Sequence, residues 1–323
     1  MKSALLTSLI GAALAVSCLQ AQDAAAFSTA ALARAAAGGG FGLKGDAPGW
    51  LFLRDDVAHA AKGPFWKATP SPAFPIISKF RETLTAAGVV LIMAPVPSKA
   101  AIYPDKLLAG SAPEAVPSSQ PFLDELKATG ATVIDLETLF REARKKAGVF
   151  CASDSHWSPA GAALAAQAIA ASPVLAALAR PGTYVTSAPE KIIIAGDLTA
   201  SPGLANTAEE ELFLTKTGTG PATAPVPVPA ATASPVILMG DSHTMVFTDG
   251  APLGMHCEGA GLRDQLQAQL GFPLVQISNQ NSGGTGARRL LNQRIQANPA
   301  YLKEVKVIIW VFSIREFTAG RWR

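Results

Sequence analysis

Short apolar runs, each long enough for one β-strand, recur along the chain and are separated by stretches with helical spacing. The runs are rich in β-branched residues, and several lack alternation of apolar and polar positions. Continuous apolar runs of this length are typical of strands buried on both faces of a sheet. The predicted strands are Val89–Ala94, Thr132–Ile134, Lys191–Ala195, Pro235–Met239, Leu274–Ile277 and Val307–Phe312.

Helical patterns lie between these runs, and one of them opens with Ser158 and Pro159, a typical N-cap and first-turn pair. Strands that alternate with helices predict an α/β fold with a mostly parallel central sheet in one domain. The predicted helices are Ile76–Ala87, Phe122–Ala128, Leu136–Ala147, Ser158–Ala170, Gly261–Leu270 and Gly286–Ala297.

The first 21 residues have the pattern of an export signal. Lys2 precedes an apolar run from Ala4 to Val16, and small or polar residues follow up to Ala21. This predicts a signal peptide over residues 1–21 and a periplasmic protein, because the run is too short to span a membrane. Two alternatives remain open, a lipoprotein signal with Cys18 as the lipidated residue and an uncleaved membrane anchor. The Ala/Gly-rich residues 22–45 are expected to form a flexible arm before a single domain over residues 46–323.

Composition narrows the class of protein. The 323 residues include 16% charged residues and carry a formal charge of +3. A charge this small gives no reason to expect nucleic acid as a partner. Cys151 and Cys257 remain after the leader, either as a disulfide or as two free thiols. No Cys/His spacing resembles a zinc site, so neither a metal nor a cofactor is expected.

The sharpest chemical signal is an apolar strand that runs directly into Gly240-Asp241-Ser242. This order places Ser242 at the carboxyl end of a parallel strand, where α/β proteins build their sites. The glycine permits a tight turn, and the N–H groups of such a turn can stabilise an oxyanion. Two interpretations stay open for the tripeptide alone, a nucleophilic serine and a simple helix cap.

A second signal is Asp154-Ser-His156-Trp157. A serine nucleophile needs a histidine base, and a carboxylate orients that histidine. In an extended segment, Asp154 and His156 point to the same side, and Trp157 can shield the base from water. The alternative is a helix cap beside a surface histidine.

The glycine-rich segment after the fifth predicted strand is a candidate for the oxyanion donors. It contains Asn281, Gly283 and Gly284. A plain turn and a phosphate cradle are the alternatives, although the segment lacks the spacing of a P-loop.

Seven motifs in this order resemble the SGNH-like domain of the alginate O-acetyltransferases AlgJ and AlgX, over about residues 46–320. They are Gly49-Trp-Leu-Phe-Leu, Ala94-Pro-Val-Pro-Ser-Lys99-Ala-Ala-Ile-Tyr103-Pro104, Asp154-Ser-His-Trp157, Gly196-Asp-Leu, Gly240-Asp-Ser242, Gly283-Gly-Thr-Gly286 and Trp310-Val-Phe-Ser-Ile-Arg315-Glu316. The resemblance implies a three-layer α/β/α sandwich of the SGNH hydrolase type. It also implies a catalytic triad of Ser242, His156 and Asp154.

The function implied by the resemblance is transfer of acetyl groups onto hydroxyls of an exopolysaccharide. The implied partners are the polysaccharide acceptor, a membrane-bound acyltransferase that supplies the acetyl group, and an exopolysaccharide biosynthesis complex. A carbohydrate acetylesterase with the same triad and a non-catalytic polysaccharide-binding subunit are the alternatives. Lys99 and Arg315 each follow a predicted strand, so both are candidates for contact with an acidic sugar, or else exposed charges at strand ends.

Overall fold

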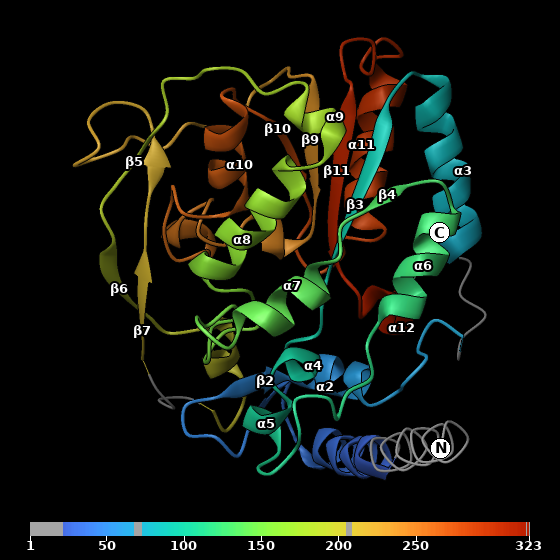
Figure 1. The fold of residues 1–323 in the computed structure, drawn as a ribbon, viewed down its shortest axis with the longest axis vertical. Helices are drawn as coiled ribbons and strands as arrows, with labels where there is room; N and C mark the ends of the chain where they lie inside the picture. The colour runs from blue at the N-terminus through green and yellow to red at the C-terminus, as the bar shows by residue number, and fades with distance from the viewer. Residues whose placement is uncertain (1–21, 68–72, 205–208, 321, 323) are drawn as a thin grey trace, which may run out of the picture.

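Five parallel strands form the central sheet of the computed structural model, which describes residues 22–67, 73–204, 209–320 and 322 (Figure 1). The sheet order is β10-β9-β11-β3-β4. Strand β11 lies in the middle, with Val307 opposite Val90 of β3 and Val236 of β9. The bounds are β3 (Val90–Val96), β4 (Thr132–Val133), β9 (Val236–Gly240), β10 (Val275–Ser278) and β11 (Val307–Ser313).

The two faces of this sheet bury separate hydrophobic clusters, so the fold has three layers. Along β11, Ile309 and Val311 point into one cluster, whereas Ile308 and Trp310 point into the other. This alternation explains why the strand is apolar at every position. The first cluster is covered by α7 (Leu136–Ala143), α8 (Pro159–Ala170) and α10 (Leu262–Leu270), and the second by α3 (Ala73–Ala86), α6 (Gln120–Ala128) and α11 (Gly286–Ala297). The predicted α/β/α sandwich is confirmed.

Local signals in the sequence account for several helix ends. The Ser158 hydroxyl accepts the Gly161 N–H at 3.1 Å, and Pro159 is the first residue of α8, as predicted. The Asp135 side chain caps α7 in the same way. Helix α10 ends at Leu270, and the left-handed conformation of the following Gly271 is typical of a helix terminus.

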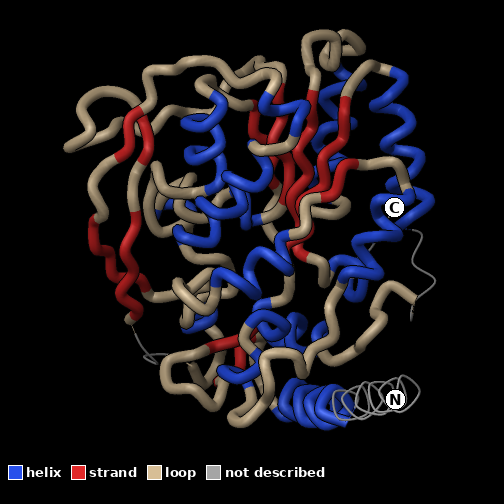
Figure 2. The backbone as a smooth tube through the Cα atoms, in the orientation of Figure 1, coloured by secondary structure: helices blue, strands red, loops and turns tan. Residues whose placement is uncertain are grey.

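One predicted strand lies outside the central sheet. The run at Lys191–Ala195 forms β6 (Glu190–Ile194), which pairs with β7 (Glu210–Leu214) in a separate antiparallel ribbon (Figure 2). Only alternate residues of β6 face the protein, and Ile193 is 58% exposed. The expectation of a buried parallel strand was wrong here, because three consecutive isoleucines hide the alternation.

Residues 22–37 are helical, which corrects the expected loose arm over residues 22–45. Phe27, Ala31 and Ala35 are spaced by four residues and are buried in the first cluster. Alanine has the highest helix propensity, so this composition favours a helix once one face can pack. The Arg34 guanidinium also pairs with the Asp46 carboxylate at 2.7 Å.

The remaining elements are short and connect or flank the layers. Strands β1 and β2 form an antiparallel pair, as do β5 and β8. Among the described residues, no helix combines the length and the apolar character needed to cross a membrane. The proposed leader, including Cys18, lies outside the described residues. The remaining bounds are β1 (Gly42–Lys44), β2 (Leu51–Leu53), α2 (Arg54–Ala60), α4 (Lys99–Ile102), α5 (Pro104–Leu107), α9 (Pro173–Ala176), β5 (Val185–Thr186), η1 (Asp197–Ala200), β8 (Thr217–Gly218), η2 (Ser242–Thr244), η3 (Ala251–Leu253) and α12 (Glu316–Ala319).

Candidate active site

Ser242 stands at the carboxyl end of β9, in the first position of the short helix η2. Gly240 ends the strand, and a side chain there would place its Cβ 2.2 Å from the Val311 carbonyl oxygen of β11. Asp241 fixes the turn that follows. Its carboxylate accepts the His243 N–H at 2.9 Å and the Ser313 N–H at 2.8 Å, so the turn is tied to the neighbouring strand.

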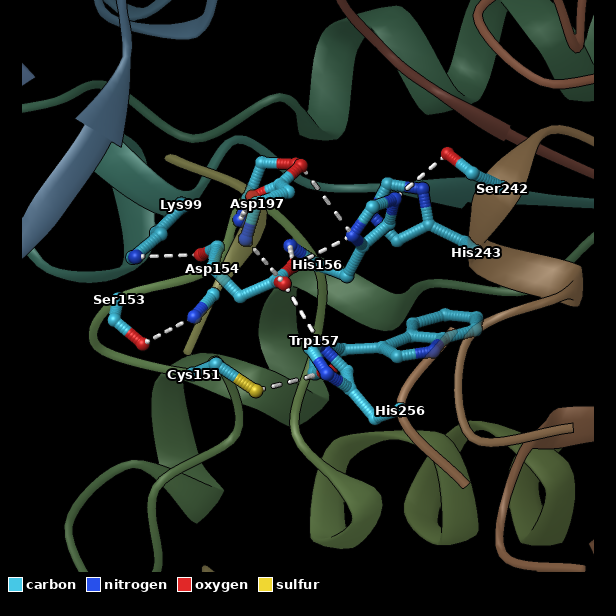
Figure 3. Close-up of polar contacts among 12 residues, drawn as sticks. Lys99, Cys151, Ser153, Asp154, His156, Trp157, Asp197, Ser242, His243 and His256 are labelled. Carbon is cyan, nitrogen blue, oxygen red and sulfur yellow. Dashed lines mark hydrogen bonds and ion pairs between the residues drawn. The ribbon is translucent and has the colours of Figure 1, made fainter. Parts of the chain in front are cut away.

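The Asp154–His156 segment forms a loop that is closed on itself before α8. The Cys151 N–H donates to the His156 carbonyl oxygen at 3.2 Å, and Phe150 and Trp157 form a β-bridge. This short closure turns both the Asp154 and the His156 side chains towards η2 (Figure 3). Asp154 is 1% exposed and His156 is 8% exposed.

The structure brings Asp154, His156 and Ser242 into one hydrogen-bonded relay. His156 Nε2 lies 2.7 Å from Ser242 Oγ, and His156 Nδ1 lies 2.6 Å from Asp154 Oδ1. An ionised carboxylate can only accept, so Nδ1 carries the proton and Nε2 is free to accept from the serine. This is the arrangement that activates a serine hydroxyl as a nucleophile.

The charges around the relay shift the pKa values of Asp154 and His156 in opposite directions. Burial raises the pKa of Asp154, but the charges and hydrogen bonds of His156 and His256 outweigh this and hold it well below its ordinary value. Burial lowers the pKa of His156, whereas the charge and hydrogen bond of Asp154, with Asp197 and Asp241, raise it overall. Asp154 is therefore the anion of the pair over the physiological pH range.

Asp197 and His256 also contact Asp154, and neither was predicted from the sequence as a site residue. The Asp197 N–H and His256 Nε2 each lie 2.9 Å from Asp154 Oδ2. The Asp197 carboxylate accepts the N–H and hydroxyl of Ser155 and lies 3.8 Å from His156 Nδ1. Asp197 belongs to the Gly196-Asp-Leu motif, which was a usable signal. His256 has no such local pattern.

Lys99 does not line an open surface, which corrects its assignment as a contact for an acidic sugar. Its side chain is buried, and Nζ donates to the carbonyl oxygens of Leu51, Ala152 and Asp154 at 2.6, 2.9 and 2.8 Å. Burial lowers the Lys99 pKa to about 8. The opposite edge of the same loop is held by Glu210, whose carboxylate accepts the N–H groups of Ala152 and Ser153. Lys99 therefore supports the loop that carries Asp154.

The glycine-rich segment lies next to the turn at Gly240–Ser242, which we call the nucleophile turn, but Gly283, Gly284 and Asn281 make different contacts. A Cβ on Gly283 would lie 2.8 Å from the Asp241 backbone nitrogen, so Gly283 packs directly against this turn. The Gly284 N–H instead hydrogen bonds to the Glu316 carboxylate, which makes it unsuitable as an oxyanion donor. Asn281 is exposed and has a left-handed backbone with φ 65°.

A groove of about 820 Å³ is lined by part of the glycine-rich segment together with Arg315 and Glu316, and we call it the strand-end groove. Ser242 is not among its lining residues. Arg315 connects the groove to the turn that carries Ser242. Its guanidinium donates to Ser313 Oγ at 3.0 Å, and the Ser313 N–H donates to the Asp241 carboxylate. Arg315 lines this groove, and its role as a contact for an acidic sugar stays a prediction. The lining residues are Leu53, Asp55, Asn279, Asn281, Ser282, Thr285, Gly286, Arg288, Arg289, Asn292, Arg315, Glu316 and Gly320.

The two cysteines and Trp157 were also candidates, and none of them belongs to the relay. Cys151 and Cys257 are free thiols, so the disulfide alternative does not hold. Trp157 is buried against His243, with ring centroids 5.1 Å apart, and His243 lies 5.0 Å from the His156 ring. These two rings exclude water from one side of the base.

One group of side chains meets the distance requirement for a metal ion. The ligand atoms of Asp154, His156 and Asp197 lie within 4.8 Å of one another. However, His156 Nδ1 already donates to Asp154, and each Asp154 oxygen accepts two hydrogen bonds. This donor set suits an acid–base relay better than a metal.

The fold resembles that of solved acetyltransferase structures. It superposes on the O-acetyltransferase domain of Pseudomonas putida AlgJ with a TM-score of 0.63 and 22% identity, covering 87% of this chain and 93% of that one. Pseudomonas aeruginosa AlgX gives a TM-score of 0.61 at 16% identity, covering 84% of this chain and 61% of that one. At such identities the similarity establishes the fold.

Sequence comparison identifies the family. Probable alginate O-acetylase AlgJ of Pseudomonas aeruginosa is 32% identical over 125 residues, which cover 38% of this chain and 31% of the relative. The counterpart in Pseudomonas syringae is 29% identical over 154 residues, covering 46% and 38%. The chain thus matches less than half the length of these curated relatives. Residues 44–314 match the family described as "SGNH hydrolase-like domain, acetyltransferase AlgX", and the chain belongs to this family.

Proposed function

We propose that this protein is a periplasmic O-acetyltransferase that moves acetyl groups onto hydroxyls of an exopolysaccharide through an acetyl-Ser242 intermediate. The observation that carries the proposal is the relay from Asp154 through His156 to Ser242 at the carboxyl edge of the sheet. Membership of the AlgX acetyltransferase family and the names of the AlgJ relatives support the choice of acetyl as the transferred group.

In the first half-reaction, His156 Nε2 takes the Ser242 proton as Oγ attacks the carbonyl carbon of the acetyl donor. The tetrahedral intermediate collapses when its bond to the leaving group breaks and His156 returns the proton to that group. Asp154 stabilises the imidazolium that forms between these steps. The Ser242 N–H is the oxyanion donor that we favour, with Gly283 as the neighbour able to supply a second N–H.

In the second half-reaction, a sugar hydroxyl gives its proton to His156 and attacks the acetyl group on Ser242. The Ser242 Oγ–acetyl bond breaks, and His156 returns the proton to the serine. The enzyme is regenerated, and an acetyl ester remains on the polymer. Water in place of the sugar would yield acetate, so transfer depends on how well the acceptor is held at the site.

The strand-end groove is the surface that we assign to the acceptor. Three arginines line it, Arg288, Arg289 and Arg315, against two acidic residues, Asp55 and Glu316. Burial and the Asp241 charge raise the Glu316 pKa to about 7, so near neutral pH this carboxyl is only partly ionised. The net positive charge suits a polymer that carries carboxylates, with arginine able to bind them in bidentate geometry.

The donor must reach the site from outside the cytoplasm if the protein is exported. A membrane-bound acyltransferase that carries acetyl groups across the membrane is the partner we propose, within an exopolysaccharide biosynthesis complex. The signal peptide over residues 1–21 is part of the same proposal, because export is what creates the need for such a partner.

A single assay separates the proposed transferase from its competitors. Purified protein is incubated with 4-nitrophenyl acetate, with and without de-acetylated uronate polymer, and acetate and polymer-bound acetyl are quantified separately. Acetylated polymer that depends on Ser242 supports the proposal. Acetate alone, unchanged by the polymer, would identify an esterase, and no turnover with retained polymer binding would identify a binding subunit.

A further inference from the structure

We propose that His256 is a positioning residue for this reaction, which orients the Asp154 carboxylate and shares its negative charge through a hydrogen bond to Oδ2. The proposal rests on the function proposed above. It adds a second histidine to the relay, so that Asp154 is held between two imidazole rings. The relay then runs from Ser242 through His156 and Asp154 to His256.

The two oxygens of Asp154 have separate partners. Oδ1 accepts both the backbone N–H and the Nδ1–H of His156, at 2.9 and 2.6 Å. Oδ2 accepts the Asp197 N–H and the Nε2–H of His256, both at 2.9 Å. Among the described residues, His256 is therefore the one side chain that donates a hydrogen bond to Oδ2. Because Asp154 is 1% exposed, water cannot replace that donor easily.

The surrounding loop holds the His256 ring in the required place. His256 has a left-handed backbone with φ 65°, a conformation that is uncommon outside glycine but that histidine adopts more readily than most residues. Its ring packs on Phe247, with centroids 5.1 Å apart, and Phe247 is itself left-handed with φ 59°. The Phe247 N–H and carbonyl oxygen bond Met255 and Ala260, so both ends of the loop are tied together.

The hydrogen bond has a consequence for the base. A donor on Oδ2 draws negative charge away from Oδ1, the oxygen that stabilises protonated His156. Without that donor, Asp154 would stabilise the imidazolium more strongly, and His156 would hold its proton to a higher pH. Since the base must be neutral to accept the Ser242 proton, His256 keeps it active at lower pH. Other titratable or charged groups also lie near the relay. They are Lys99 of α4, Cys151 of the Asp154 loop, Asp197 of η1, Glu210 of β7, Asp241 of the nucleophile turn and His243 of η2.

The test compares His256→Met with His256→Gln. Glutamine places an amide N–H near the position of Nε2, whereas methionine has similar length and flexibility without a donor. Both variants bear the same left-handed backbone cost, so this cost cancels between them. The pH profile of kcat/KM for 4-nitrophenyl acetate is measured for each. The Met variant is expected to move the acid limb upward by about half a unit, and the Gln variant to stay near wild type.

A second readout does not depend on turnover. The NMR titration of the His156 ring in histidine-labelled protein should show the same upward shift in the Met variant. Ser242→Ala serves as the control for the proposed function, because loss of turnover in that variant shows that the assay reports the relay. A Met variant whose rate falls uniformly, with the acid limb and the His156 titration unmoved, would overturn the role of His256. If Ser242→Ala keeps full turnover, the proposed function fails, and the NMR titration still decides the role of His256.

Discussion

His156 Nε2 lies 2.7 Å from Ser242 Oγ, although 86 residues separate the two along the chain. The contact exists because β9 delivers Ser242 to the carboxyl edge of the sheet while the loop before α8 delivers His156 to the same edge. One short hydrogen bond thus joins two distant segments into a chemical unit, and each partner can be removed separately.

Replacing Ser242 with alanine should reduce acetyl-ester turnover at least about a thousandfold, because the members of such a relay act together. The free energy of unfolding should change by less than about 1 kcal/mol, since a single small hydroxyl is lost. Turnover assays and urea denaturation on the same preparation provide both numbers. Wild-type turnover in this variant would remove Ser242 from the mechanism.

Lys99→Met should lower kcat about tenfold or more while leaving KM for the polymer within about twofold. The ammonium supports the loop of Asp154 and does not line the groove, so its loss displaces the relay but not the acceptor. Three buried carbonyl groups also lose a donor, and we expect about 2–4 kcal/mol lower stability. A selective increase in KM would instead return Lys99 to the acceptor surface.

Arg289→Ala and Arg315→Ala should weaken binding of an acidic polymer, since both side chains line the strand-end groove. We expect KM to rise about three- to tenfold for a uronate polymer at low salt, with a smaller effect at high salt. The turnover of 4-nitrophenyl acetate, which carries no charge, serves as the control and should change little. Equal effects on both substrates would argue against an acceptor role for this surface.

Glu316→Gln should change the pH dependence of stability. Burial and the Asp241 charge raise the Glu316 pKa to about 7, above its ordinary value of 4.5. The folded protein therefore binds the proton more tightly than the unfolded chain, and the stability from this group is lost as pH rises from 4.5 to 7. Glutamine stays neutral, so the variant should gain about 1–3 kcal/mol over wild type at pH 8 and little at pH 4. Equal differences at both pH values would contradict the shifted pKa.

The layered fold could be predicted because the core strands are continuous apolar runs and the helices between them have apolar residues at helical spacing. The β6 segment shows the limit of that argument. Its three isoleucines have the composition of a buried strand, and only pairing with β7 shows that Ile193 faces outward. The helix at residues 22–37 was missed for a related reason, because alanine-rich sequence carries little contrast between faces.

The candidate site could be located in part from local chemistry. Asp154, His156 and Ser242 each follow a recognisable pattern, so the sequence indicated which side chains to bring together. Lys99 was expected on the rim of the site, but it is buried because its three carbonyl acceptors belong to two other segments. His256 reaches Asp154 through a left-handed loop, and no local periodicity predicts such a conformation.

The most direct test of the central claim is to trap the acetyl group on the enzyme. Protein mixed with 4-nitrophenyl acetate is quenched in acid within the first turnover, digested, and analysed by peptide mass spectrometry, with Ser242→Ala treated in parallel. We expect one acetyl group on the peptide that contains Ser242, and we expect it to disappear when uronate polymer is added before the quench. Full turnover with no acetyl on Ser242, or acetylation that persists in the Ser242→Ala variant, would contradict the central claim.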